Sequence, residues 1–324
     1  MFAPTSQPRV VGIAAGCVAD RLFGDPRRGH PVALFGGAAA ALERRTYADT
    51  RTAGALHTAV LLGGLALLGI AADRTALRRG AVAGALTTAA TVFVSLGGTS
   101  LARTVEEMAH HLDRGDVDAA RGLLPSLCGR DPAVLDEAGL ARAALESVAE
   151  NTSDAHVAPL LWAAIGGVPA VLVYRGANTL DAMIGHKSPR YHRFGWGAAR
   201  FDDAANYLAA RATAVLVAAC APVVGGSPVA ALRAWKRDAH RHPSPNAGVA
   251  EAAFAGALGV RLGGPTQYAH ELEIRPTLGD GPPPRVSDLR RAVRLSRAVQ
   301  VAAAGVALGL SAVGRTGRRA CPPC

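Results

Sequence analysis

The sequence is poor in charge, in aromatic residues and in two common polar residue types. Charged residues make up only 19% of its 324 residues and aromatic residues 5%, while hydrophobic residues make up 50%. It contains only four asparagines and two lysines. So low a charge content in so apolar a chain excludes an intrinsically disordered protein. The composition indicates a membrane protein or a very alanine-rich core.

Cysteines are few and scattered, and no linker divides the chain. An odd set of five cysteines excludes a disulfide framework. The terminal Cys321-Pro322-Pro323-Cys324 has metal-ligand spacing, but a zinc site needs two further ligands nearby and none accompanies it. The apolar run at 10–19 lacks a preceding basic region, so we expect no cleaved signal peptide. Without a Pro/Ser-rich linker, we expect a single domain over 1–324.

Several familiar functional motifs are also missing. There is no Walker loop, no G-x-G-x-x-G after a strand, no G-x-S-x-G elbow and no H-E-x-x-H. The net charge of +10 raises the question of nucleic acid, but no basic cluster with interleaved aromatic residues occurs. We therefore expect anionic lipid and phosphorylated compounds as partners, and no nucleic acid.

Three apolar segments are long enough to cross a bilayer, which takes about 20 mostly apolar residues in a helix. They are 53–72, 80–102 and 298–314, and core helices of a soluble bundle are the alternative for the last two. Two further stretches, 155–174 and 209–232, are broken by prolines and glycine pairs, which is tolerated at membrane depth only inside protein or beside a wet cavity. The sequence predicts an all-α, multi-pass membrane helical bundle with broken or re-entrant apolar segments and polar, site-forming loops.

The distribution of Lys and Arg predicts the orientation of these segments, because cytoplasmic loops carry the excess of positive charge. If all five stretches cross, 22 basic residues lie inside and 11 outside. If the two broken stretches are re-entrant, 27 lie inside and 6 outside. The second arrangement puts every polar motif described below on the cytoplasmic side of the cell membrane, and we favour it.

Four polar islands interrupt the apolar background. The first joins Gly24-Asp25-Pro26 to His30-Pro31. Gly-Asp-Pro is a turn signal by itself, so a structural turn is one interpretation. The functional interpretation is that Asp25 and His30 face a site.

The second island places three carboxylates at helical spacing. Glu146, Glu150 and Asp154 stand at i, i+4 and i+8, so one helix face would stack them, with Asn151 beside them. Their repulsion is costly on an apolar-flanked helix unless a cation or basic groups relieve it. Magnesium prefers such oxygen ligands; the alternative is a solvated acidic face.

The third island, 174–206, concentrates residue types that are rare elsewhere in the chain. One of the two lysines and two of the four asparagines lie in it. The candidates for gripping phosphate are Arg175, Lys187, Arg190 and Arg193. The candidates for metal binding or proton transfer are Asp181, Asp202 and Asp203. Juxtamembrane anchoring is the alternative, and it explains the basic residues but not Asp or Asn178.

The fourth island runs from His242 through Ser244-Pro245-Asn246 to Glu251. Ser-Pro-Asn before an alanine-rich stretch is an adequate helix cap. The functional interpretation is that Asn246 and Glu251 reach substrate or nucleotide.

Taken together and in order, the islands resemble the CobD/CbiB family of cobalamin biosynthesis, the adenosylcobinamide-phosphate synthases. The resemblance covers most of 12–270. It rests on five ordered motifs, around Gly24-Asp25-Pro26, Glu146 to Asn151, Asn178 to Met183, Ala199 to Asp203, and Ser244 to Gly248 with 256–265.

The resemblance implies a multi-pass inner-membrane enzyme. It would use ATP to attach aminopropanol, or its phosphate, to the f-propionate of adenosylcobyric acid, a corrinoid. A carboxylate must be activated for such a ligation, most simply as an acyl phosphate, and then attacked by an unprotonated amine. That chemistry needs magnesium-bound ATP, cations for the transferring phosphoryl group and a base.

The islands offer candidates for each of these parts. For magnesium we expect Glu146, Glu150 and Asp154, and for phosphate or nucleotide Arg175, Lys187, Arg190 and Arg193. For catalysis we expect Asp181, His30 and Asp25, and for substrate contacts Asn151, Asn178, Asp202, Asp203 and Asn246. The competing hypothesis is a membrane corrinoid-binding, transport or scaffold subunit without its own chemistry. A soluble partner from the cobalamin pathway is compatible with both.

Overall fold

The computed structural model describes residues 6–25, 29–186, 188–267 and 272–313. These residues form α-helices with a single two-stranded hairpin, which confirms the predicted all-α class. Chain contacts divide the protein into two compact units. The first unit comprises Met1–Gly97, Ala158–Asn206 and Ala303–Cys324, and the second comprises Gly98–Val157 and Tyr207–Ala302. Each unit is thus built from separated stretches of chain, and the single domain over 1–324 stays a prediction.

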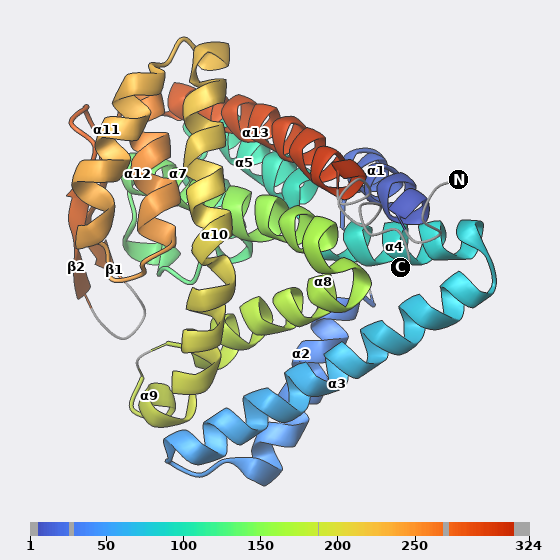
Figure 1. The fold of residues 1–324 in the computed structure, drawn as a ribbon. Coiled ribbons are helices and arrows are strands. Elements are labelled where there is room, and N and C mark those ends of the chain that lie inside the picture. The colour runs from blue at the N-terminus through green and yellow to red at the C-terminus, as the bar shows by residue number, and fades with distance from the viewer. Residues whose placement is uncertain (1–5, 26–28, 187, 268–271, 314–324) are drawn as a thin grey trace. The chain divides into compact units, whose positions relative to one another are not determined.

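The first unit is a group of helices packed around α8. They are α1 (Ser6–Phe23), α2 (Pro31–Thr46), α3 (Arg51–Arg78), α4 (Ala81–Ser95), α8 (Ala158–Ile184), α9 (Tyr191–Phe194) and the start of α10 (Trp196–Cys220). Helix α1 packs along α4, and α3 packs along α8 (Figure 1). Glycines permit the close approach of α1 to α4, because a Cβ at Gly12 would lie 2.5 Å from Cβ of Thr88. Small residues at such contacts are typical of membrane helix pairs.

Helix α8 contains the break that the sequence predicts. Gly167 has φ 66° and ψ −153°, and Pro169 follows it. A residue with a side chain rarely adopts that backbone conformation, and proline removes a helical hydrogen bond. Arg9 donates from Nη1 to the carbonyl of Ala164, 3.4 Å away, in the turn before the break. The interruption is therefore built into the helix and stabilised from α1.

The second unit combines six helical segments with the hairpin. The helices are α5 (Gly98–Asp113), α6 (Val117–Leu123), α7 (Glu137–Thr152), α11 (Pro228–Asp238), α12 (Ala247–Leu258) and most of α13 (Val286–Val313), with the end of α10. A π-helical turn, Ser153–Val157, follows α7, and short 3-10 helices lie at Leu124–Ser126, Pro132–Val134, Ala221–Val224 and Ala239–Arg241.

The hairpin pairs β1 (Leu262–Gln267) with β2 (Leu272–Leu278) in antiparallel register and lies beside α11 and α12 (Figure 1). Gly264 pairs with Arg275, and a bulge separates it from Leu262. Gly263, at the bulge, has φ 79°, and a Cβ there would lie 2.0 Å from the carbonyl oxygen of Pro276. Only glycine fits this position. The hairpin itself was not expected from the sequence.

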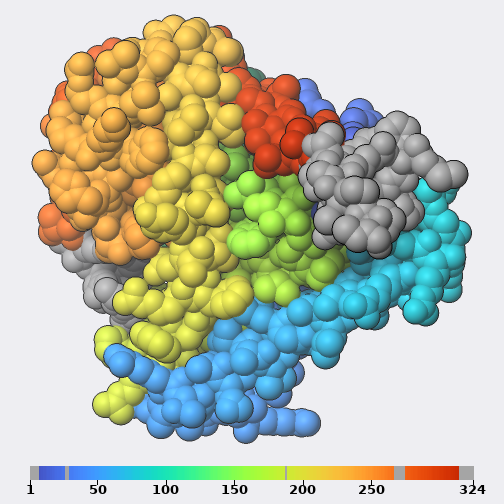
Figure 2. All heavy atoms as spheres, viewed as in Figure 1, coloured from blue at the N-terminus to red at the C-terminus, as the bar shows by residue number. Residues whose placement is uncertain are grey.

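Five helical segments are long and apolar enough to cross a membrane, as in a multi-pass protein. They are Arg51–Arg78, Ala81–Asp113, Glu137–Ile184, Trp196–Val224 and Val286–Val313. The predicted span 53–72 lies within the first of them, and 80–102 and 298–314 overlap the second and the last, although the chain leaves the helix between α4 and α5. Helix α3 lies at the surface in Figure 2 and exposes large apolar side chains, including Leu67, which is 70% exposed. An exposed apolar helix face of this kind suits contact with lipid.

Candidate functional site

Two polar clusters, one in each unit, contain six of the fifteen predicted site residues. The first, which we call the α8–α10 cluster, comprises Tyr174, Arg175, Asn178, Asp181, Asp202 and Asn206. Positions 174, 178 and 181 share one face of α8, and 202 and 206 share one face of α10, because residues three or four apart lie together on a helix.

Direct contacts hold the α8–α10 cluster together. The Tyr174 hydroxyl donates to Oδ1 of Asn206 at 2.8 Å, and Nδ2 of Asn206 donates to Oδ2 of Asp202 at 3.0 Å. Arg175 donates from Nη1 to Oδ1 of Asn178 at 3.1 Å. Asp202 also interacts with Asn178 and with the charge of Asp181. The arrangement gathers two carboxylates, two amides and a phenol, which can bind a polar ligand and transfer a proton.

The second cluster, which we call the Glu251 cluster, comprises Arg130, Glu146, Glu150, His242, Glu251 and Arg275. Glu146 is 2% exposed and forms an ion pair with Arg130, which is 6% exposed. The other carboxylate oxygen of Glu146 accepts a hydrogen bond from the backbone N–H of Gly263 at 2.7 Å. Arg142 donates from Nη1 to the carbonyl of Gly263, also at 2.7 Å. Helix α7 is thereby tied to the hairpin.

Glu251 of α12 lies inside this cluster and is only 1% exposed. Burial raises the pKa of its carboxyl well above the usual value, and the charges of Glu146 and Glu150 raise it further. Arg275 and Arg130 act in the opposite direction. Burial of this carboxyl therefore disfavours its ionised form.

The expected magnesium ligands do not form a metal site in the described part of the chain. Both oxygens of Glu146 are engaged by Arg130 and Gly263, Glu150 is exposed, and Asp154 lies half-buried in the π-helical turn. No three His, Cys, Asp or Glu side chains among the described residues are grouped to hold a metal. Arg130 pairs with Glu146 on this helix face. The residues present do not fit a three-carboxylate magnesium site.

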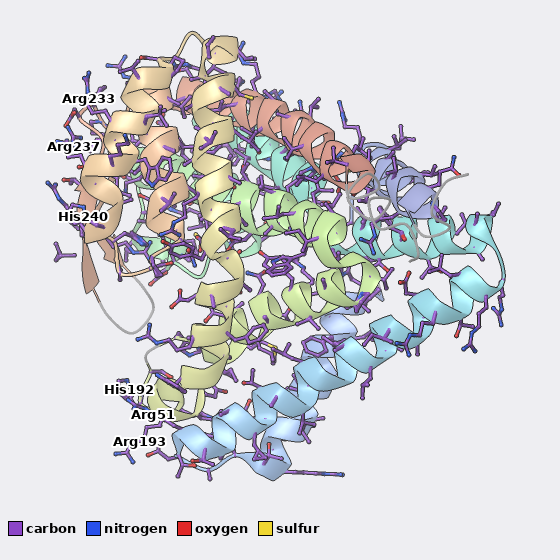
Figure 3. All side chains as sticks on the ribbon, in the orientation of Figure 1. Arg51, His192, Arg193, Arg233, Arg237 and His240 are labelled. Atoms are coloured by element: carbon purple, nitrogen blue, oxygen red, sulfur yellow. The ribbon has the colours of Figure 1, made fainter. Side chains whose placement is uncertain are left out.

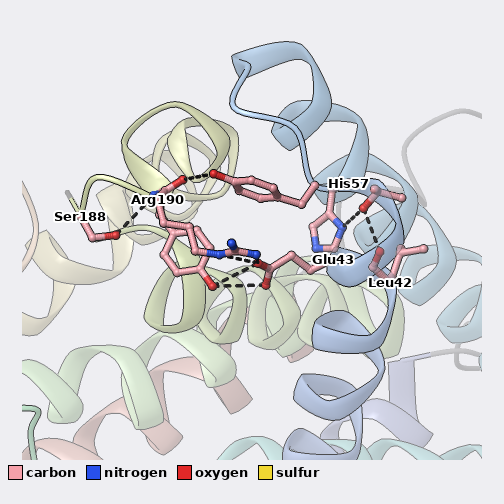
Figure 4. A network of polar contacts seen from close by, with 8 residues as sticks. Leu42, Glu43, His57, Ser188 and Arg190 are labelled. Carbon is pink, nitrogen blue, oxygen red and sulfur yellow. Dashed lines mark hydrogen bonds and ion pairs between the residues drawn. The ribbon is translucent and has the colours of Figure 1, made fainter.

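Arg190, an expected phosphate ligand, is engaged in a separate network of the first unit (Figure 4). Its Nη2 donates to Oε1 of Glu43 at 2.8 Å, and its guanidinium lies 4.0 Å from the ring centroid of Tyr47. The Tyr47 hydroxyl donates to the Arg190 carbonyl at 3.0 Å, and that of Tyr191 donates to Glu43 at 3.1 Å. These contacts hold the segment before α9 against the C-terminal end of α2. Arg190 therefore stabilises the packing of this segment.

The structure places Asp25 and His30, two residues of the first island, close together. His30 Nε2 lies 3.8 Å from Oδ1 of Asp25. The other ring nitrogen, Nδ1, accepts from the backbone N–H of Val32 at 3.2 Å, so His30 also caps α2. The turn at Pro26 lies outside the described residues, and it stays a prediction that Asp25 and His30 face a site.

The remaining predicted residues lie outside the two clusters. Arg193 is exposed at one end of the first unit, 3.9 Å from Asp49 (Figure 3), and Asp203 faces Arg200 at 3.9 Å. Lys187 lies outside the described residues, as does the terminal Cys-Pro-Pro-Cys.

Two predicted asparagines contact their own unit. Asn151 donates from Nδ2 to the carbonyl of Ser147 on its own helix at 3.0 Å. Asn246 accepts at Oδ1 from Nη1 of Arg211 at 2.8 Å. Each therefore has a protein partner within the second unit.

Arg130, Arg275 and Glu43 were missed because none belongs to an island. Each is a charged residue in a chain with little charge, and each meets an opposite charge from a distant segment. The sequence offered only their residue type as an indication, because a buried Arg or Glu is almost always paired with an opposite charge. Which carboxylate each arginine pairs with depends on the tertiary structure.

Comparison with known proteins identifies the family. The CobD/CbiB protein family model matches residues 13–296. The chain is 67% identical over 310 residues to the cobalamin biosynthesis protein CobD of Mycobacterium tuberculosis, which covers 96% of this chain and 98% of the relative. It is 43% identical to that of Chromobacterium violaceum, over 85% of this chain and 88% of the relative. It is 40% identical to that of Pelobacter propionicus, over 95% of this chain and 97% of the relative.

No solved structure matches this chain. The range matched by the family model, 13–296, extends across both units and spans the positions of both polar clusters. The chain therefore belongs to the CobD/CbiB family of cobalamin biosynthesis.

Proposed function

We propose that the protein is an ATP-dependent amide ligase, an adenosylcobinamide-phosphate synthase. It joins aminopropanol or aminopropanol phosphate to the f-propionate carboxyl group of adenosylcobyric acid. The observation that carries this proposal is the family match over 13–296, together with 67% identity to a protein named for cobalamin biosynthesis. Five apolar helical segments support an integral location in the cell membrane. We expect the site-forming loops on the cytoplasmic side, where ATP is available.

The α8–α10 cluster supports the chemistry of carboxylate activation. Arg175, and Lys187 beyond the described residues, are the proposed phosphate contacts, because a guanidinium or an ammonium stabilises the charge of a transferring phosphoryl group. Asp181 and Asp202 are the proposed proton-transfer and substrate groups, since they interact in a largely buried setting. Magnesium would enter with ATP and neutralise its phosphates, because this ion needs few protein carboxylates when a nucleotide supplies oxygens.

The test is a ligation assay on membranes that contain the protein. The substrates are adenosylcobyric acid, aminopropanol or its phosphate, ATP and magnesium, with products identified by mass. We expect an amide product that requires ATP. Asp202→Asn should lower its rate by about 10²-fold, typical of losing a positioned polar group, whereas Asp118→Asn, at an exposed position, should leave it unchanged.

Two outcomes would contradict the proposal. Corrinoid binding without product from either amine would favour a binding, transport or scaffold subunit. Product that forms without ATP would exclude a ligase that activates the carboxylate by phosphorylation. If product appears only when cytosol is added, a soluble pathway partner contributes to the reaction.

A further inference from the structure

A pocket lies in the first unit, between α8 and the start of α10. Its volume is about 490 Å³, within the range of pockets that hold small molecules. Trp162 and Val173 line it from α8, and Phe201 and Ala204 line it from α10. The Trp162 indole donates from Nε1 to the carbonyl of Ala205 at 3.2 Å and so joins the two walls. Every lining residue belongs to the first unit, so this unit alone defines the pocket.

The break in α8 forms part of the pocket wall. Gly166 and Pro169 both line the pocket, on either side of Gly167, where the backbone leaves the helical conformation. Irregular backbone at membrane depth must be enclosed by protein or line a cavity, and this break lines one. The Gly-Gly and Pro signals that interrupt the helix therefore also account for the hollow beside it.

The pocket is apolar and adjoins a polar surface on one side. None of its lining residues, all of which the structure describes, is charged. Tyr174 belongs both to this wall and to the α8–α10 cluster, where its hydroxyl donates to Asn206. In the same cluster, the Nε of Arg175 is buried and has no hydrogen-bond partner among the described residues. A ligand that matches both surfaces has an apolar edge and polar arms.

Among the substrates of the proposed reaction, the corrinoid has this combination. Aminopropanol and its phosphate are small and polar. The adenine of ATP has a ring edge of donors and acceptors, which this wall would leave unpaired, because the indole of Trp162 and the hydroxyl of Tyr174 are already engaged. A corrinoid ring carries methyl groups and primary amide arms on its rim. Part of that rim can fill the pocket while amide arms bond to the α8–α10 cluster.

We propose that the pocket at the α8 break binds the methyl-bearing edge of the corrinoid ring and so directs the ring's polar arms toward the α8–α10 cluster. This assignment rests on the proposed function and adds to it the surface that holds the macrocycle. Phe201 is 43% exposed, and ring binding would bury it together with the face of Trp162. Burial of aromatic side chains favours binding.

Equilibrium dialysis of the full-length protein in lipid nanodiscs tests this assignment. The ligand is adenosylcobyric acid in the dark, measured by its visible absorbance without ATP or amine, and a non-hydrolysable ATP analogue is measured separately. Ala204→Trp should fill the pocket and weaken corrinoid binding by about tenfold or more. Phe201→Ala should weaken it by about tenfold, because apolar contact area is lost.

A matched control and a crosslink complete the test. Ala41→Trp, at an exposed position on α2 of the same unit, should bind corrinoid as the wild type does, and thermal unfolding establishes that each variant is folded. Benzoylphenylalanine incorporated at position 201 should attach on irradiation to dicyanocobyric acid, which lacks the photolabile cobalt–carbon bond. The same group at position 67, on the exposed face of α3, should not. Mass spectrometry identifies the adducts.

The outcomes separate this assignment from the proposed function. Wild-type corrinoid affinity in both Ala204→Trp and Phe201→Ala overturns the pocket assignment, as does equal crosslinking at positions 67 and 201 or a wild type that binds no corrinoid. Loss of the ATP analogue or of a co-purified lipid from Ala204→Trp, at unchanged corrinoid affinity, also overturns it and assigns the pocket to adenine or to a lipid chain. A wild type that binds corrinoid in the pocket but forms no amide overturns the ligase proposal alone.

Discussion

Glu146 illustrates how a single residue can be identified from sequence while its contacts cannot. Its spacing from Glu150 and Asp154 indicates a shared helix face, and the structure gives that face to one helical segment. Its electrostatic partner is Arg130, sixteen positions earlier in the chain. Both side chains of this ion pair are buried. A charge buried this deeply requires compensation, because its desolvation is costly.

Removing Glu146 should therefore strongly destabilise the second unit. Glu146→Ala leaves the Arg130 guanidinium buried without its counter-charge, and we expect a loss of about 3–5 kcal/mol. Thermal unfolding of detergent-solubilised protein measures this loss. The double variant Glu146→Leu with Arg130→Met should recover much of it, because neither buried charge remains. Equal stabilities of the single and double variants would contradict a paired role.

Asp238 makes a pH-dependent contribution to stability at the end of α11. Hydrogen bonds from Arg237 and from the backbone N–H of Gly279 lower the pKa of its carboxyl below the usual 3.8, and burial acts against them. A lowered folded-state pKa stabilises the fold above the unfolded-state value, and that stability is lost as the pH falls through the folded-state pKa.

We therefore expect Asp238→Asn to be less stable than the wild type at pH 7. Its disadvantage should shrink as the pH falls below about 4, since the wild-type carboxyl then becomes protonated. Unfolding midpoints measured from pH 7 to pH 3 provide the comparison. A constant difference between the two proteins over that range would exclude this linkage.

At the scale of elements, the break in α8 depends on one glycine. Gly167→Ala would put a Cβ 2.7 Å from Nη2 of Arg9, at a backbone conformation that disfavours side chains. We expect it to destabilise the first unit by about 1–3 kcal/mol. Gly64→Ala on α3 is the matched control, because its Cβ would meet nothing within 4 Å and alanine favours helix. Thermal unfolding should rank Gly167→Ala well below the control.

The segment between α8 and α10 is held by a small number of contacts. Glu43 accepts from Arg190 and from Tyr191 (Figure 4). Gly54 of α3 lies so close to this segment that a Cβ there would sit 1.7 Å from the carbonyl oxygen of Phe194. The contacts of Glu43 and of Gly54 thus fix the position of the segment that precedes α10, the helix that contains Asp202.

Glu43→Ala should therefore loosen this segment without unfolding the bundle. The segment should be cleaved by trypsin about tenfold faster than in the wild type, because local opening governs proteolysis. Mass spectrometry of the fragments locates the cut. A cleavage rate equal to the wild type would exclude a latching role for Glu43, and Glu107→Ala serves as the control for a lost surface carboxylate.

For the whole molecule, the two possible topologies differ in whether the two broken segments, 155–174 and 209–232, cross the membrane. If they are re-entrant, as the basic residues favour, positions 188 and 244 both lie in the cytoplasm. If they cross, position 188 lies outside and 244 inside.

Membrane-impermeant maleimide should decide the orientation in a variant with all five native cysteines replaced. We expect Ser188→Cys and Ser244→Cys to react in inverted vesicles but not in intact spheroplasts. Arg79→Cys should react in spheroplasts, because both arrangements place it outside. Labelling of position 188 in spheroplasts would show that the broken segments cross.

The sequence by itself determined the helical membrane class, the three long apolar segments, the break in α8 and the family. These properties follow from local composition and order: runs of apolar residues, the Gly-Gly and Pro signals, and motifs in succession. The same information placed Asn178, Asp181 and Asp202 among the candidate site residues, because rare polar types stand out in an apolar chain.

Only the tertiary structure decided which charges meet. Glu146 is bound by Arg130 and by the hairpin, and Arg190 by Glu43, so neither is free for the ligand first expected. It also placed Glu251 of α12 among carboxylates and arginines from three other segments. Electrostatic energy depends on distance in space and on burial. Those quantities are set by packing between segments far apart in the chain, which spacing along the sequence does not contain.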